Sequence, residues 1–182
     1  MTGLFFWRCL HFVLASGPQN IGWCANPLET LKLQEDLKAY SIALAGILDA
    51  HMQKAKETLT VALSKLPQET KEIQFGLHPP QEPDGRFSVI LHLVGPNLFT
   101  LNKAIDGHRV LFDVRFVDGK IKPDVPMFDP FDQPFSVNDA IVETAASWLE
   151  KIWDTIDRKA DCPPALIFGE DGWGEGMPKR LS

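Results

Sequence analysis

One apolar stripe runs along residues 37–66 at the spacing of an α-helix, and it restricts the folds open to this chain more than any other feature. Its members recur at steps of three, four or seven residues: Leu37, Leu44, Leu48, Met52, Ala55, Leu59, Ala62, Leu63 and Leu66. The charged residues of this segment lie off the stripe: Lys54, Lys56, Glu57 and Lys65. The pattern predicts a long helix with one buried face.

The ends of this helix are also marked in the sequence. Asn26-Pro27-Leu28-Glu29 places Asn at the N-cap and Pro at the first helical position, and Pro67 ends the run. An unbroken helix between these ends would be about 60 Å long at 1.5 Å per residue, which exceeds the width of a small domain. We therefore expect a break before Leu37 or near Gly46, with the striped part packed.

Three segments in the middle of the chain alternate apolar and polar residues, a pattern typical of strands with one wet face: residues 73–77, 86–94 and 108–117. The apolar side chains of the third segment are predicted to point into the core: Val110, Phe112, Val114 and Phe116. Its polar side chains are predicted to face outward: Arg109, Asp113 and Arg115. Asp118-Gly119 then predicts a two-residue hairpin turn that leads to a short strand at residues 120–122.

A second helix and a last strand follow. Ser136 and Asp139 form an approximate capping box, and an apolar stripe extends from there to Ile156. Pro163-Pro164 follows this helix, and residues 165–168 are apolar enough for a short strand. The order of elements predicts an α+β fold: an antiparallel sheet of about four to five strands with a long N-terminal helix and a C-terminal helix packed on one face.

Residues 27–182 are predicted to form one domain, preceded by a poorly structured extension at residues 1–26. Residues 4–14 are apolar but too short to span a bilayer, and Arg8 and His11 interrupt them. A signal peptide and a start upstream of the true first residue are the alternatives for this segment. The cysteines are scattered without metal-ligand spacing, which is typical of reduced thiols in a cytoplasmic protein: Cys9, Cys24 and Cys162.

The formal charge of −6 and the pI near 5.3 disfavour nonspecific binding to nucleic acids or anionic membranes, because both need a basic face. A basic protein is the natural electrostatic partner. The five histidines lack zinc-type spacing, no GxSxG is present, and the acidic loops do not fit a calcium-binding pattern. We therefore expect no catalytic residue, cofactor or metal.

The segment from Phe168 to Pro178 combines four glycines and three acidic residues with one tryptophan. Glycine at this density disfavours helix and strand, so the segment is predicted to be an acidic loop shaped by its backbone. A second acidic and aromatic loop precedes the last helix. Together they predict a partner-binding surface: Asp129, Phe131, Asp132, Glu170, Asp171, Trp173 and Glu175. The alternative for Trp173 is that it packs inward and anchors the tail.

In size, acidity, element order and the Phe168-Gly-Glu-Asp-Gly-Trp-Gly tail, residues 37–181 resemble the small acidic α+β proteins that bacteria carry as immunity partners of secreted toxins, or as uncharacterised neighbours of such genes. The resemblance implies a stoichiometric binder that occludes a toxin. The rival hypothesis is a small-molecule-binding or enzymatic domain with a pocket between sheet and helices. That pocket would be lined by Phe112, Phe116 and Trp148, with His92 or Asp113 as its polar group.

Overall fold

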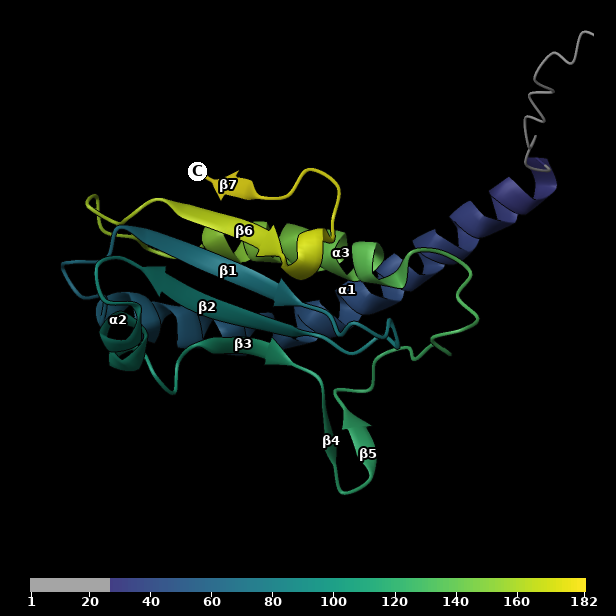
Figure 1. Ribbon diagram of the computed structural model, residues 1–182, viewed down its shortest axis with the longest axis horizontal. Helices are drawn as coiled ribbons and strands as arrows, with labels where there is room; N and C mark the ends of the chain where they lie inside the picture. Colours follow the sequence, from purple (N-terminus) through teal and green to yellow (C-terminus); the bar gives the residue numbers. More distant parts are fainter. Residues whose placement is uncertain (1–26) are drawn as a thin grey trace, which may run out of the picture.

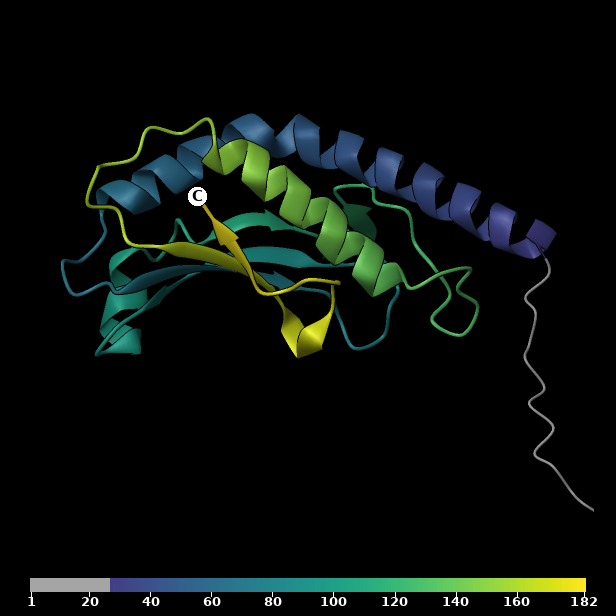
Figure 2. The ribbon, with the colours of Figure 1, turned by 90° about the horizontal axis from the view of Figure 1, so that it is seen from above.

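The computed structural model describes residues 27–182, which form two layers. Two helices, α1 (Pro27–Ser64) and α3 (Val137–Trp153), lie side by side on one face of a five-stranded sheet (Figures 1 and 2). The strands lie in the order β3 (Val110–Asp113), β2 (Ser88–Val94), β1 (Glu72–His78), β6 (Ala165–Gly169) and β7 (Lys179–Leu181). The predicted α+β class, with both helices on one face, is confirmed.

The sheet is mixed, whereas the sequence analysis expected antiparallel strands throughout. The β1–β2, β2–β3 and β6–β7 pairs are antiparallel, but β6 runs parallel to β1, with Ala165 opposite Ile73. The reason is the path of the chain, because α3 crosses the sheet and returns the chain to the end at which β1 begins. The amide of Ile73 donates to the carbonyl of Pro164 at that end, at 2.9 Å.

The core lies between the helices and the sheet. Alternate residues of β1 and β2 point toward the helices and are buried: Ile73, Phe75, Leu77, Val89, Leu91 and Leu93. Leu59 of α1 and Trp148 and Ile152 of α3 are buried in the same hydrophobic cluster. The stripe of the first helix and the alternation of the central strands therefore meet as the sequence predicted.

The expected break in the first helix is wrong, since α1 is continuous through Leu37 and Gly46. Residues 28–39 are exposed, and burial begins at Tyr40. Figure 2 shows this first part of α1 projecting beyond the sheet and α3. The domain width therefore did not limit the helix, because its N-terminal part leaves the domain and only the later part packs.

The predicted strand at residues 108–117 is divided in two. Phe112 and Val114 are buried as predicted, but Phe116 is 61% exposed, and the prediction that it points into the core is wrong. Phe116 lies in β4 (Arg115–Val117), which pairs with β5 (Lys120–Lys122) in a separate two-stranded sheet. The predicted Asp118-Gly119 turn joins these strands, with positive φ at both residues.

Val110 was also predicted to point inward, but it is exposed and its neighbour Leu111 is buried. The pairing of β3 with β2 shifts between Val89 and Ile90, and this irregularity changes which side chains of β3 face the helices. Sequence alternation alone does not reveal such a shift.

Three short elements were not predicted. Helix α2 (Leu98–Ala104) begins at Asn97, whose side chain accepts from the amide of Thr100. The 3₁₀ turn η1 (Glu170–Gly172) lies in the glycine-rich tail, and β7 closes the sheet beyond it. The predicted N-cap at Asn26 and the extension at residues 1–26 lie outside the described residues. Among the described helices, none is both long and apolar enough to cross a membrane.

Candidate functional site

Within residues 27–182, no layer of helices covers the face of the sheet turned away from α1 and α3. Its side chains are half-buried and mix apolar, aromatic and polar types: Gln74, His78, Ile90, His92, Leu166 and Phe168. Both α2 and η1 project beyond the sheet on this side (Figure 2). We call this surface the uncovered face.

Four side chains on the uncovered face form one chain of contacts. Glu170 Oε2 lies 2.8 Å from His78 Nδ1, and His78 Nε2 lies 3.2 Å from His92 Nε2. Arg109 Nη2 lies 3.0 Å from His92 Nδ1, while Arg109 Nε donates to the carbonyl of Leu91 at 3.1 Å. The chain therefore extends from η1 across β1 and β2 to the residue that precedes β3.

His78 reaches His92 because residue 76 is a glycine. A Cβ at Gly76 would overlap the His78 imidazole, so the ring occupies the space that a side chain there would fill. Phe168 packs edge-on against His78, with ring centroids 6.0 Å apart. A glycine in mid-strand weakens a sheet, and here it gives the histidine its position.

The donors fix the direction of this hydrogen-bond chain. A guanidinium can only donate, so His92 Nδ1 accepts from Arg109 and carries no proton. His92 is then protonated on Nε2 and donates to His78 Nε2. His78 carries its proton on Nδ1 and donates it to the Glu170 carboxylate. In this arrangement each ring nitrogen of the two imidazoles has a partner.

The electrostatics of the site favour the same state. Burial, followed by the charge of the Arg109 guanidinium, lowers the pKa of His92 from 6.5 to about 4, and a positive charge on His78 would lower it further, against the opposing effect of Glu170. A second proton on His92 would make it a cation between the Arg109 guanidinium on one side and the His78 imidazole on the other. The two imidazoles thus connect the Arg109 guanidinium to the Glu170 carboxylate.

Acid is expected to destabilise the protein through His92. The unfolded chain binds a proton near pH 6.5, whereas folded His92 binds it only near pH 4, so stability present above pH 6.5 is lost as the pH falls toward 4. Urea unfolding midpoints measured across this window should fall in the wild type. His92→Gln should reduce this loss of the urea midpoint with falling pH. His108→Gln should not, because His108 makes no contact in the Glu170–His78–His92–Arg109 hydrogen-bond chain. Equal slopes in the wild type and His92→Gln would contradict this assignment.

The glycine-rich tail folds back against α3. The amide of Gly174 donates to Asp139 Oδ1 at 2.8 Å, and Trp173 is partly buried against the core. The Ser136 hydroxyl donates to the other oxygen of Asp139 and makes no cap bond to the helix, so the predicted capping box takes a different form. Trp173 therefore has an anchoring role in the fold.

The other predicted partner-binding residues lie in two places. Glu170 joins the hydrogen-bond chain, while Asp171 and Glu175 are exposed in the segment that follows it. Asp129 and Asp132 close a tight turn that presents Phe131. The segments that hold the two groups lie apart in both ribbon views (Figures 1 and 2).

The functional roles of His78 and Arg109 were not predicted from the sequence, and His92 was named only in the rival hypothesis. Gly76 inside an alternating strand was the one local signal, because a glycine there marks a close approach by another group. The contacts themselves join residues far apart in the sequence, and spacing could not reveal them. No cluster of three or more His, Cys, Asp or Glu residues that could hold a metal ion occurs within residues 27–182.

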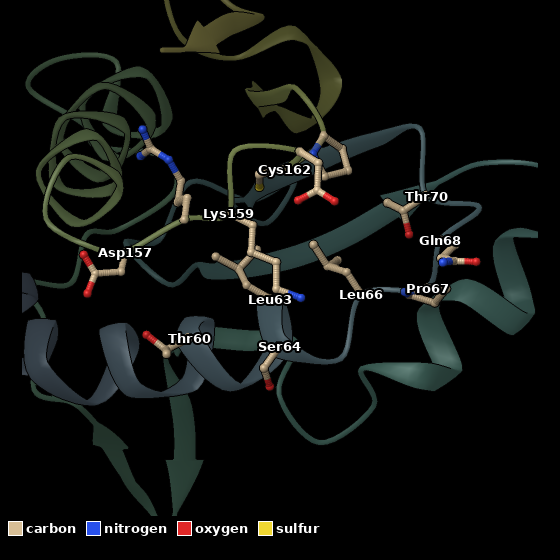
Figure 3. A pocket seen from close by; sticks show the side chains of 13 residues that line it. Thr60, Leu63, Ser64, Leu66, Pro67, Gln68, Thr70, Asp157, Lys159 and Cys162 are labelled. Atoms are coloured by element: carbon tan, nitrogen blue, oxygen red, sulfur yellow. The ribbon is translucent and has the colours of Figure 1, made fainter.

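The residues expected to line a pocket between the sheet and the helices do not lie together around one. Phe112 and Trp148 pack against each other with ring centroids 6.2 Å apart, and Phe116 lies in the outer hairpin. His92 is on the opposite face of the sheet. A cavity of about 420 Å³ lies elsewhere, at the C-terminal ends of α1 and α3 (Figure 3).

Comparison with known proteins gives a family and no function. No curated protein and no solved structure matches the chain. Residues 35–181 match the model of a family described as a family of unknown function, DUF6389. This match includes every strand and helix except residues 27–34 at the start of α1. The chain therefore belongs to the DUF6389 family.

Proposed function

We propose that the protein is a non-catalytic protein-binding module, and the observation that carries this proposal is the setting of Phe131. Its side chain is 98% exposed. Its amide donates to Asp129 Oδ1 at 2.9 Å, and the amide of Asp132 donates to the Asp129 carbonyl at 3.0 Å. An aromatic ring held outward on a closed turn offers a partner a large apolar area at little cost in conformational entropy.

The partner that fits this surface is a basic protein. The chain carries a net charge of −6, and the glycine-rich tail adds the exposed carboxylates of Asp171 and Glu175. The half-buried Ile90, Leu166 and Phe168 on the uncovered face would add apolar contact. Together with the resemblance to immunity proteins, these features support a toxin whose active site the bound protein occludes.

The acidic side chains of the tail and the Phe131 ring are expected to affect different rate constants of binding. Asp171→Asn with Glu175→Gln should slow association and reduce its dependence on salt, because exposed charges steer the encounter. Phe131→Ala should speed dissociation and cost at least about 2 kcal/mol of binding energy. The product of the adjacent gene is the first partner to test, by pull-down followed by surface-based binding kinetics.

Glu35→Gln with Asp36→Asn removes the same number of charges from the exposed, projecting part of α1 and serves as the matched control. Glu170→Gln is kept as a separate variant because it also alters the bond to His78. Unchanged kinetics in both test variants, with a partner that binds the wild type, would refute the assigned surface.

An acid–base enzyme is the second candidate, and one observation favours it. The Glu170 carboxylate on His78 Nδ1 is the arrangement that orients an imidazole as a general base. His78 Nε2 would become free to act once His92 turned away. Hydrolysis of activated ester substrates that His78→Gln abolishes and His108→Gln retains would favour this candidate over binding alone.

A further inference from the structure

A row of side chains on α1, separate from its buried stripe, has the spacing of a helix that pairs with another helix. Its members recur at alternating steps of three and four residues: Leu28, Leu31, Glu35, Lys38, Ile42 and Ala45. Three of them are large apolar residues with more than half of their surface exposed: Leu28, Leu31 and Ile42. We call these six residues the outer row.

The outer row begins in the part of α1 that projects beyond the sheet and α3 (Figure 2). Residues 28–39 are all exposed in the described structure. Leu33 and Leu37 continue the buried stripe, which enters the domain core at Tyr40. The outer row lies on another side of the helix and stays at the surface beyond that point. Because a helix owes most of its stability to the packing of an apolar face, exposed apolar residues over this length indicate an interface.

A shallow groove on the domain continues the outer row. Ile42 and Ala45 of α1 form one side of this groove, Thr144 and Ser147 of α3 form the other, and its volume is about 360 Å³. A second helix laid along the outer row would therefore contact α1 and α3 together.

The charges of the outer row are complementary to those of a second copy in antiparallel orientation. With a twofold axis midway between Glu35 and Lys38, Glu35 of each copy faces Lys38 of the other. The same axis pairs the apolar members of the row: Leu31 with Ile42, and Leu28 with Ala45. A twofold interface has this reciprocity, because each contact between two positions occurs twice.

Other arrangements of two α1 helices place unfavourable pairs in the row. A parallel pair would set Glu35 against Glu35 and Lys38 against Lys38, and like charges repel. An antiparallel pair shifted by one heptad would set both charged residues against apolar side chains, which leaves each charge without a counter-charge. The two charged residues within an apolar row therefore fix both the orientation and the register.

We propose that the protein forms a homodimer through antiparallel packing of the outer rows of two α1 helices. The projecting part of each helix then lies along the groove between α1 and α3 of the other copy. Residues 28–45 contain three acidic residues and two lysines, so most of the net charge of −6 on each chain lies elsewhere and opposes this contact little. The inference is independent of the proposed protein-binding function, because the outer row shares no residue with the Phe131 turn or the glycine-rich tail.

Charge reversal tests the interface in the full chain, whose sedimentation equilibrium should give twice the chain mass. Glu35→Lys creates two Lys–Lys contacts and Lys38→Glu creates two Glu–Glu contacts, so each variant alone should raise the dissociation constant of the dimer at least about tenfold. An equimolar mixture of the two restores both contacts between opposite charges and should form a dimer with one copy of each. Asp36→Lys makes the same change of charge on another side of α1 and should remain dimeric.

Disulfide formation reports the orientation of the two helices. Leu31→Cys mixed with Ile42→Cys should give a disulfide between these two positions, because they face each other across the interface. Leu31→Cys alone should not link to itself. Peptide mass spectrometry distinguishes these links from any that the native cysteines form.

Four results would overturn the inference: a monomeric wild type, a dimer that survives both charge reversals, a mixture of the two charge variants that stays monomeric, or a link of Leu31→Cys to itself. The control variant for partner binding, Glu35→Gln with Asp36→Asn, still places an oxygen acceptor opposite Lys38 and is therefore expected to stay dimeric.

Discussion

Replacement of Trp148 by alanine is expected to lower the free energy of unfolding by about 3–5 kcal/mol, the largest effect of any single substitution considered for this protein. Trp148 is only 2% exposed and packs against Phe112 across the contact between α3 and the sheet. Removing the indole leaves a cavity that α1 and the sheet cannot close without distortion. Urea denaturation followed by far-UV circular dichroism measures the loss.

Phe131→Ala is the control for this prediction, because it also removes an aromatic ring but from a side chain that is almost fully exposed. It should change the free energy of unfolding by less than about 0.5 kcal/mol. A loss below about 1 kcal/mol in Trp148→Ala would mean that α3 does not pack on the sheet as described.

Gly169→Ala is expected to destabilise the protein by about 1–3 kcal/mol and to release the glycine-rich tail. Gly169 has φ −87° and ψ 132°, a conformation that any residue adopts, so backbone strain is not the reason. A Cβ there would overlap the carbonyl oxygen of Trp173, and a backbone atom cannot rotate away. The tail would have to shift, and the bond from the Gly174 amide to Asp139 would be lost.

Gly46→Ala is the matched control and should have the opposite sign. Gly46 is an exposed position inside α1, with no atom within 4 Å of an added Cβ, so alanine should stabilise the helix by about 0.5–1 kcal/mol. Hydrogen exchange at the Gly174 amide reports on the tail directly. Slow exchange retained in Gly169→Ala would contradict the close packing of this segment.

Elements whose burial follows a regular period could be predicted from the sequence. The stripe of α1 from Leu44 onward, the alternation of β2 and the Asp118-Gly119 turn were predicted correctly because each depends on neighbours along the chain, whereas Leu37, the first member of the predicted stripe, is exposed. The β3 pairing shift and the separation of β4 could not be predicted, since the pairing of β3 with β2 decides them. The parallel position of β6 depends on where α3 delivers the chain.

The candidate site shows the same division. An acidic loop with an aromatic residue was predicted at residues 129–132 from composition, and the structure adds that Phe131 is exposed on a tight turn there. The link from Glu170 through His78 and His92 was not predicted, because each contact depends on the alignment of strands distant in sequence. Trp173 carried two alternatives, and its partial burial gives it an anchoring role while its place in a partner interface stays a prediction.

The parallel pairing of β6 with β1 also determines the order in which the protein can fold. Strand β1 lies at the centre of the sheet, yet one of its two hydrogen-bonding edges pairs with β6, which is synthesised after β2, β3 and α3. During synthesis, the early hairpin of β1 and β2 therefore exposes an apolar, unpaired edge until residues 165–169 leave the ribosome. Pairing between segments so distant in sequence is slow, and an open edge is a site for aggregation. We expect the nascent chain to depend on chaperones over this interval.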